Sequence, residues 1–263
     1  CLLLALLLTG VLLAGCAADT ADANADLPVI TIGCDNYPPF TYVNSDGKPV
    51  GIDVELADEA FRRMGYRPEF VTINWAEKNE LLENGVIDCI WSSFSMSGRA
   101  DEYTWAGPYM YSHQVVAVMP DSDIQTLADL AGKTVVVQAT TKPESLFLDG
   151  NDPRIPEIRA LHSLQKRELI YSYLAKGYAD AVAAHEISIL QFMKDYGFEF
   201  RILEEPLEAV ELGVAFSRSD DRGIAQALSA TLEEMQADGT TRSILAGYFA
   251  DPDKYLEADG YAD

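Results

Sequence analysis

The sequence predicts an α/β fold in which strands alternate with helices and the sheets are mostly parallel. Short apolar or β-branched runs, such as Val29–Cys34 and Thr134–Gln138, have the length and composition of strands. Between such runs, apolar residues recur at every fourth position, as they do from Ile52 to Met64, which is typical of an amphipathic helix. A glycine such as Gly65 often follows the helical segment and indicates its C-terminal cap. A chain of 263 residues that is 48% hydrophobic can form one large domain or two modest ones.

In the first half of the chain, turn signals separate the expected elements. Pro39 forces Pro38 out of the helical region, so the segment after the first strand is a loop. A continuous apolar run near Ile90 is typical of a buried parallel strand. The expected elements are a strand at Val29–Cys34, a loop at Asp35–Phe40, a turn at Asn44–Gly47, a helix from Ile52 to Met64, a strand at Pro68–Ile73, a helix at Glu77–Asn84 ended by Gly85, and a strand at Val86–Trp91.

The second half repeats this alternation. Pro143 occupies a position typical of the first turn of a helix, so that helix should begin at Thr141 or Lys142. The other expected elements are strands at Thr134–Gln138, Asp180–Ala184, Phe200–Leu203 and Val210–Phe216, and helices at Ser163–Lys176 (followed by Gly177), Glu186–Tyr196, Asp221–Ala237 and Thr241–Phe249.

Charge and cysteine content exclude several classes of function. With 42 acidic and 19 basic residues the formal net charge is −23, which repels nucleic acid and anionic lipid but not a zwitterion. We therefore expect no nucleic-acid partner. The chain has only three histidines and no Cys-x-x-Cys spacing, so we expect neither a metal site nor a cofactor. Cys34 and Cys89 lie among apolar neighbours and are expected to be free, buried thiols.

The N-terminus resembles a bacterial export signal. Residues 1–15 are uncharged and rich in Leu, but the run is shorter than the roughly 20 residues that a membrane-spanning helix needs. It ends in Leu13–Cys16, which resembles the lipobox of bacterial lipoproteins, and this resemblance implies that Cys16 is acylated. The alternative is an ordinary signal that happens to contain a cysteine. Residues 16–27 are then the lipidated cysteine and a polar tether, and the protein is exported and anchored to the cell membrane, facing the extracellular or periplasmic side.

Several segments, taken in order, resemble the family 3 extracellular solute-binding proteins, the polar amino-acid receptors of ABC importers. Ser92–Ser95 with Arg99 is one of them. The resemblance also covers Asp35–Phe40, Gly51–Ala57, Thr104–Tyr109, Leu130–Val135 and Ala237–Thr240, and so extends over nearly all of the mature chain.

This resemblance implies a two-lobe fold of the periplasmic-binding-protein type, with two hinge strands and a ligand cleft between the lobes. Residues 28–112 and 213–263 would form lobe 1, and residues 116–207 would form lobe 2. The chain would cross between them near 113–115 and 208–212. The implied partners are a free amino acid and an ABC transporter permease with its ATPase, and the implied state is a monomer.

In lobe 1, Arg99 matches the arginine with which the family binds the ligand carboxylate. Its planar guanidinium can pair with both oxygens, although an ordinary surface arginine is the alternative. Ser92, Ser93 and Ser95 follow the expected buried strand, at a sheet edge where α/β proteins bind ligands. Simple turn chemistry is the alternative for these serines.

The other expected ligand contacts also rest on the resemblance. Thr140 and Thr141 would approach from lobe 2, where helix-start N–H groups bind anions, unless they only cap that helix. Tyr37 and Trp75 match aromatic positions that contact the ligand side chain, with core packing as the alternative. Lysines such as Lys142 and Lys78 are expected to be solvated.

His185 departs from the family, which normally has at this position the aspartate that binds the ligand ammonium. If a neutral His185 took that role, affinity for an amino acid should fall from about pH 8 to about pH 5.5, as the imidazole gains a proton. Two alternatives are that Glu186 binds the ammonium, with little pH effect above about pH 5.5, and that the ligand is an acid without an ammonium, which a protonated His185 would bind more tightly.

Two other functions compete with that of a carrier. Cyclohexadienyl or arogenate dehydratases share this fold, but the sequence shows no nucleophile or cofactor motif, so we expect no enzyme. A sensor module for a small carboxylate would continue into a transmembrane helix, whereas this sequence ends in an acidic segment at Asp263.

Overall fold

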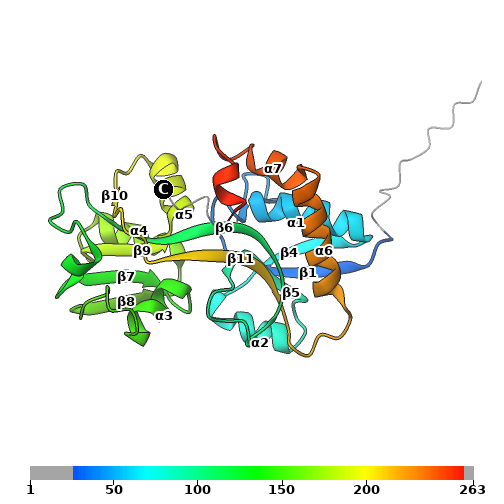
Figure 1. The fold of residues 1–263 in the computed structure, drawn as a ribbon, viewed down its shortest axis with the longest axis horizontal. Coiled ribbons are helices and arrows are strands. Elements are labelled where there is room, and N and C mark those ends of the chain that lie inside the picture. The colour runs from blue at the N-terminus through cyan, green and yellow to red at the C-terminus, as the bar shows by residue number, and fades with distance from the viewer. Residues whose placement is uncertain (1–25, 258–263) are drawn as a thin grey trace, which may run out of the picture.

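The computed structural model describes residues 26–257, and its strands and helices alternate along the chain as the sequence predicts (Figure 1). The strands are β1 (Val29–Cys34), β2 (Tyr42–Val43), β3 (Pro49–Val50), β4 (Arg67–Thr72), β5 (Cys89–Ser95), β6 (Thr104–Val118), β7 (Thr134–Gln138), β8 (Ala160–Leu164), β9 (Ala181–His185), β10 (Arg201–Ile202) and β11 (Glu208–Phe216).

The helices include three short 3₁₀ turns. They are α1 (Ile52–Met64), η1 (Trp75–Glu77), α2 (Lys78–Glu83), η2 (Leu127–Leu130), α3 (Lys142–Asp149), α4 (Arg167–Ala175), α5 (Glu186–Tyr196), α6 (Ile224–Ala237), α7 (Thr240–Leu245) and η3 (Asp253–Tyr255). Gly65 has a left-handed backbone, as the predicted C-cap of α1 requires.

Two long strands connect two lobes, which confirms the predicted two-lobe fold (Figure 1). The strand order is β4-β1-β5-β11-β6-β9-β7-β8, with β10 also on β6. Strand β6 pairs antiparallel with β11 from Thr104 to Gln114 and then with β9 from Gln114 to Val118. Lobe 1 therefore contains β1, β4 and β5, lobe 2 contains β7, β8 and β9, and β6 and β11 run between them. The residue boundaries of the lobes stay a prediction.

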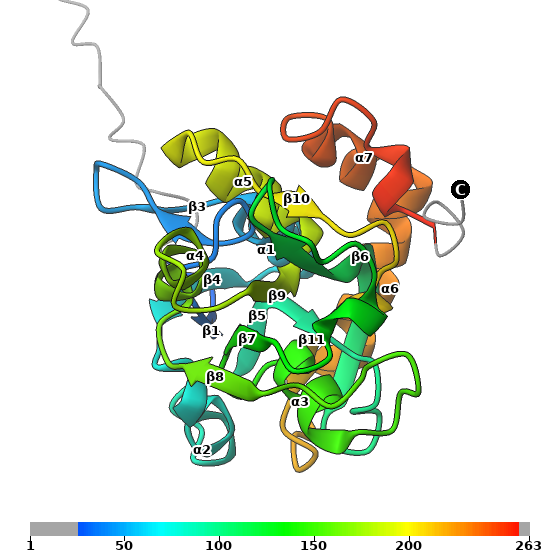
Figure 2. The ribbon, with the colours of Figure 1, turned by 90° about the vertical axis from the view of Figure 1, so that its left-hand side faces the viewer.

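Each lobe packs helices on the faces of its part of the sheet. In lobe 1, α1 and α6 cover one face, where Phe61, Trp91 and Leu228 are buried together. The other face buries a cluster that includes Trp75 and Phe94. In lobe 2, α4 and α5 cover one face (Figure 2). On the opposite face, Leu127 and Leu130 of η2 are buried in a separate cluster. Trp91 is thus a core residue, as expected, and the lobes bury largely separate clusters, with Ile187 of α5 packed into the lobe 1 cluster.

Several predicted elements were wrong at their ends. The helix expected from Asp221 begins at Ile224, and the helix expected to reach Phe249 ends at Leu245. Two other differences have a clear physical cause. The strand expected from Val86 begins only at Cys89, because Val86 is 59% exposed and Asp88 turns back to accept a hydrogen bond from Thr31 N at 2.8 Å. The helix expected from Ser163 begins only at Arg167. The preceding residues form β8, an edge strand that pairs with β7 alone and is half-buried, so its apolar pattern is weak.

The described chain also contains the free cysteines that the sequence predicts. Cys34 and Cys89 are both buried, and neither forms a disulfide. The signal remnant, the acylated Cys16 and most of the tether lie outside the described residues, as do residues 258–263. Within residues 26–257, no helix combines the length and the apolar character needed to cross a bilayer.

Candidate ligand-binding site

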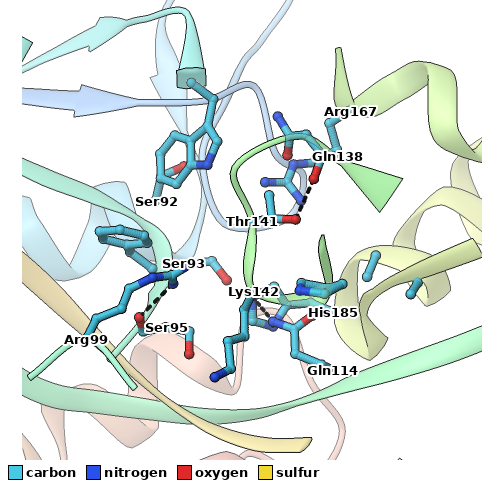
Figure 3. Close-up of a pocket in the computed structure, with 15 residues that line it drawn as sticks. Ser92, Ser93, Ser95, Arg99, Gln114, Gln138, Thr141, Lys142, Arg167 and His185 are labelled. Carbon is cyan, nitrogen blue, oxygen red and sulfur yellow. Dashed lines mark hydrogen bonds between the residues drawn. The ribbon is translucent and has the colours of Figure 1, made fainter. Parts of the chain in front are cut away.

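A cavity lies between the two lobes, beside the strands that connect them (Figure 3). It holds about 380 Å³ of empty space, part of which is open to solvent. Lobe 1 contributes Trp75, Ser92, Ser93, Phe94, Ser95 and Arg99 to its wall, β6 contributes Gln114, and lobe 2 contributes Gln138, Thr141, Lys142, Pro143, Arg167, Ala183, Ala184 and His185.

The serine segment is the last part of β5 itself, and not a loop after it. Ser93 has a φ of 50°, which is uncommon for a residue other than glycine. The fully buried Asp53 at the start of α1 accepts a hydrogen bond from Ser93 N at 2.7 Å and another from Tyr109 Oη at 2.9 Å. Burial raises the pKa of Asp53 to about 7, against the effect of these hydrogen bonds. A buried acid in the lobe 1 core thus fixes the strand end that faces the cavity.

Arg99 follows in a tight turn. Its backbone N–H donates to Met96 O at 3.0 Å, and its Nη1 donates to Ser95 O at 3.1 Å (Figure 3). The guanidinium lies 5.0 Å from the centre of the Phe94 ring. Burial lowers its pKa from the ordinary value, and no carboxylate of the described residues forms an ion pair with it. The guanidinium therefore faces the cavity with N–H groups that are available to bind a ligand.

The lobe 2 wall includes the start of α3. Thr141 is the N-cap residue, and its hydroxyl donates to Gln138 O at 2.6 Å. Lys142 reaches back across the cleft, where its Nζ lies 3.3 Å from Ser97 O and 3.2 Å from a carboxylate oxygen of Glu208. The side chain of Lys142 is 13% exposed, so the expectation of a solvated lysine was wrong.

An ion pair joins the lobes beside the cavity. Asp35 in lobe 1 accepts hydrogen bonds on one oxygen from Gln138 Nε2 at 2.7 Å and from Arg167 Nε at 3.3 Å, both in lobe 2. The Arg167 guanidinium stacks 3.3 Å from the centre of the Tyr37 ring. The side chains of Arg167 and Asp35 are only 8% and 15% exposed, so these contacts hold the lobes in a closed arrangement.

His185 is buried at the end of β9. Its Nε2 lies 2.8 Å from Gln114 Nε2 and its Nδ1 lies 3.2 Å from Ser112 Oγ. A neutral ring with its proton on Nδ1 satisfies both contacts, because Gln114 can then donate to the free lone pair on Nε2. Burial and the nearby Arg167 lower the pKa of His185 to about 3. The imidazole therefore stays neutral between pH 5.5 and 8, and the pH switch expected from the sequence was wrong because it assumed an ordinary histidine.

Several polar atoms around the cavity have no hydrogen-bond partner within the described protein. They are Trp75 Nε1, Ser93 Oγ, Ser95 Oγ, Gln114 Oε1 and Gln138 Oε1. Buried polar groups are nearly always hydrogen-bonded, so such a group of atoms around one cavity indicates a polar ligand or ordered water.

The structure brings most of the predicted site residues together. Trp75, Ser92, Ser93, Ser95, Arg99, Thr141 and His185 all line the cavity. Tyr37 is buried against Arg167 outside this lining, and Thr140 lies in a neighbouring groove, where it accepts a hydrogen bond from Lys78 Nζ at 3.1 Å. Lys78 is 5% exposed, so its expected solvation was also wrong.

Sequence reasoning missed Gln114, Gln138 and Arg167. Arg167 was hidden because the helix was expected to begin at Ser163, which would have placed this residue in a helix interior and not at a helix start facing the cleft. Among the described residues, no group of histidine, cysteine and acidic side chains could hold a metal ion.

Comparison with known proteins agrees with this architecture. The family model of the bacterial extracellular solute-binding proteins, family 3, matches residues 30–251. The histidine-binding periplasmic protein of Salmonella typhimurium is 34% identical over 230 residues, which cover 84% of this chain and 87% of that protein. The glutamate-binding protein GluB of Corynebacterium glutamicum is 27% identical, covering 90% and 85%. The crystal structure of Tv2483 bound to L-arginine is 27% identical with a TM-score of 0.78, covering 85% and 91%. This chain belongs to the bacterial extracellular solute-binding proteins, family 3.

Proposed function

We propose that this protein captures a free amino acid, or a close relative that carries a carboxylate, outside the cell membrane and delivers it to an ABC importer. The observation that carries the proposal is the cavity between the lobes, where Arg99 lies without a carboxylate partner among the described residues. A guanidinium pairs with both oxygens of a carboxylate, and Ser93 and Ser95 supply hydroxyl donors beside it. Named relatives that bind histidine, glutamate and arginine support the same class of solute.

Closure of the lobes is the proposed means of capture. The Asp35–Arg167 pair and the Gln138–Asp35 hydrogen bond join the lobes only when they are closed. A ligand that contacts Arg99 in lobe 1 and Thr141 in lobe 2 adds contacts to the closed state alone, so it shifts the population toward that state. We place the lobe boundaries at 28–112 with 213–263, and 116–207, as predicted.

A carrier needs no catalytic group, and we propose that this site performs no chemistry on its ligand. The only histidine in the described lining, His185, has a pKa lowered to about 3 by burial, which is unsuited to proton transfer at neutral pH.

Export and anchoring complete the proposal. We infer that Cys16 carries acyl chains, two or more of which are needed for stable attachment to a membrane. Mass spectrometry of protein extracted from membranes should then show a diacylated or triacylated N-terminal cysteine peptide. Cleavage at another bond without lipid would contradict this part of the proposal.

A thermal-shift screen of the twenty amino acids and small carboxylic acids tests the binding function. At a ligand concentration a hundredfold above Kd, binding adds about 2.7 kcal/mol to the free energy of unfolding. For a protein of this size, the melting temperature should rise by about 5–10 °C. Arg99→Ala should remove this rise. No shift with any compound of the panel would contradict the proposed function.

A further inference from the structure

The side chains that line the cavity carry positive charge, and the acidic partners of two of them lie behind the wall. Arg99, Lys142 and Arg167 all line the cavity, and none of the described lining residues is Asp or Glu. The cations come from both lobes: Arg99 lies on the lobe 1 side, and Lys142 and Arg167 lie on the lobe 2 side (Figure 3). This distribution distinguishes the cavity from the strongly acidic surface of the whole chain.

Acidic side chains behind the wall neutralise only part of this charge. Asp35 pairs with Arg167 at 3.3 Å, and Glu208 pairs with Lys142 at 3.2 Å. Arg99 has no such partner among the described residues. The buried Lys78 lies immediately behind, 5.1 Å from the Trp75 ring, and adds a further cation. Glu102 also acts on both Arg99 and Lys78, and Glu144 acts on Lys78, so acidic side chains around the site offset its charge, while the described lining of the cavity itself carries only cations.

The positions of the cations fit a ligand with an anionic group at each end. One carboxylate at Arg99 receives donors from lobe 1, including the unpartnered hydroxyls of Ser93 and Ser95. A second carboxylate reaching Lys142 or Arg167 contacts lobe 2. Such a ligand would bridge the lobes by charge at both ends, whereas a basic side chain would add a further cation to a wall that already carries Arg99, Lys142 and Arg167.

The unpartnered acceptor of Gln138 does not distinguish an ammonium from a hydroxyl substituent on the carbon chain between the two carboxylates. Gln138 Oε1 has no partner within the described protein, and its amide is oriented by the hydrogen bond to Asp35. This oxygen can accept a hydrogen bond from an ammonium or from a hydroxyl group.

We infer that the ligand is a small dicarboxylate, either an acidic amino acid or the corresponding oxo or hydroxy acid, and not a neutral or basic amino acid. This inference rests on the proposed function and narrows it to a class of solute.

Calorimetric titration of the wild-type protein at neutral pH tests the inference with ligands of matched length. L-Glutamate, 2-oxoglutarate and L-glutamine share a five-carbon chain, and aspartate, malate and asparagine form a shorter series. We expect a dicarboxylate to bind at least about tenfold more tightly than its monoamide, because the monoamide brings no negative charge to the cationic lobe 2 wall. Glutamate compared with 2-oxoglutarate tells the amino acid from the oxo acid. Tighter binding of glutamine, histidine or arginine overturns the inference and leaves the proposed function intact, whereas no binding by any amino acid or diacid overturns both.

Two lysine variants of lobe 2 provide the matched comparison. Lys142→Met should reduce the preference for the dicarboxylate over its monoamide by at least about tenfold. Lys133→Met makes the same change at a lysine that pairs with Asp123 away from the cavity, and it should leave the preference unchanged. Arg167→Gln tests the second candidate cation if Lys142→Met does not fold, as judged by circular dichroism. An unchanged preference in both Lys142→Met and Arg167→Gln would contradict the assignment of the second carboxylate to lobe 2.

Discussion

Asp53 should make the stability of this protein fall as the pH rises, and Asp53→Asn should remove that dependence. The carboxyl group is fully buried and has a pKa raised to about 7, whereas an ordinary aspartate titrates at 3.8. Between these values the folded protein holds a proton that the unfolded chain releases. Stability from this group is therefore fully present below about pH 4 and is lost as the pH rises through about 7.

The expected magnitude follows from the shift. A shift of about three pH units corresponds to about 4 kcal/mol, as an order of magnitude. The amide side chain of the Asp53→Asn variant is neutral at every pH, and its oxygen can still accept the hydrogen bond from Ser93 N. Relative to wild type, the variant should therefore gain about 3 kcal/mol of stability between about pH 4.5 and about pH 8, since about 1 kcal/mol of the total is already lost below pH 4.5.

Urea unfolding of both proteins at these pH values, at constant ionic strength, measures the difference. Asp46→Asn, in the exposed turn between β2 and β3, is the control and should follow wild type at both pH values. A stability difference between Asp53→Asn and wild type that is the same at both pH values would refute the reasoning, because it would mean that the buried carboxyl group keeps an ordinary pKa.

The remaining predictions concern affinity, backbone geometry and thiol reactivity. Arg99→Ala should weaken ligand binding by about 2–5 kcal/mol, and Arg99→Lys should also weaken it because an ammonium cannot form the two-pronged pair; calorimetry with an unchanged Kd would move the carboxylate site elsewhere. Gly51→Ala should cost more than about 2 kcal/mol of stability, since Gly51 has a φ of 126° and a Cβ there would overlap the backbone oxygen of Phe40. Gly47→Ala, at a φ of 76° with open space around it, should cost only about 1 kcal/mol, and equal costs in urea unfolding would contradict the steric argument. Cys34 and Cys89 should react with a thiol reagent only after unfolding, because burial raises the pKa of both; rapid labelling of the native protein would contradict their buried positions.

Where the apolar pattern and the flanking turn or cap residues agree, the sequence predicts both ends of an element correctly. The strands at Val29–Cys34 and Thr134–Gln138 and the helix at Glu186–Tyr196 have the predicted bounds, because their apolar patterns and flanking residues agree. The edge strand Ala160–Leu164 could not be predicted, since it is stabilised by pairing with β7 and only half-buried. The long strand Thr104–Val118 was recognised only as a lobe crossing, because a Pro and a Gly interrupt its pattern.

The cavity residues that belong to a recognisable motif were predicted, whereas the residues that contacts between distant elements bring to the cavity were missed. Arg99 and the serines were found through their motif, and the structure brings them to one cavity. The cation at Arg167 becomes part of the site through its pairing with Asp35, 132 positions away in the chain, and local sequence carries no signal of that contact. The ordinary titration expected of His185 failed for the same reason, because its environment is built from Gln114 and Arg167 on other elements.

A crystal structure of the complex with the compound that gives the largest thermal shift tests the central claim most directly. The account predicts the ligand in the cavity between the lobes, with both oxygens of one carboxylate paired with the Arg99 guanidinium at about 2.7–2.9 Å and with contacts to Thr141 from lobe 2. A ligand bound outside the cleft, or one whose carboxylate does not contact Arg99, would contradict it.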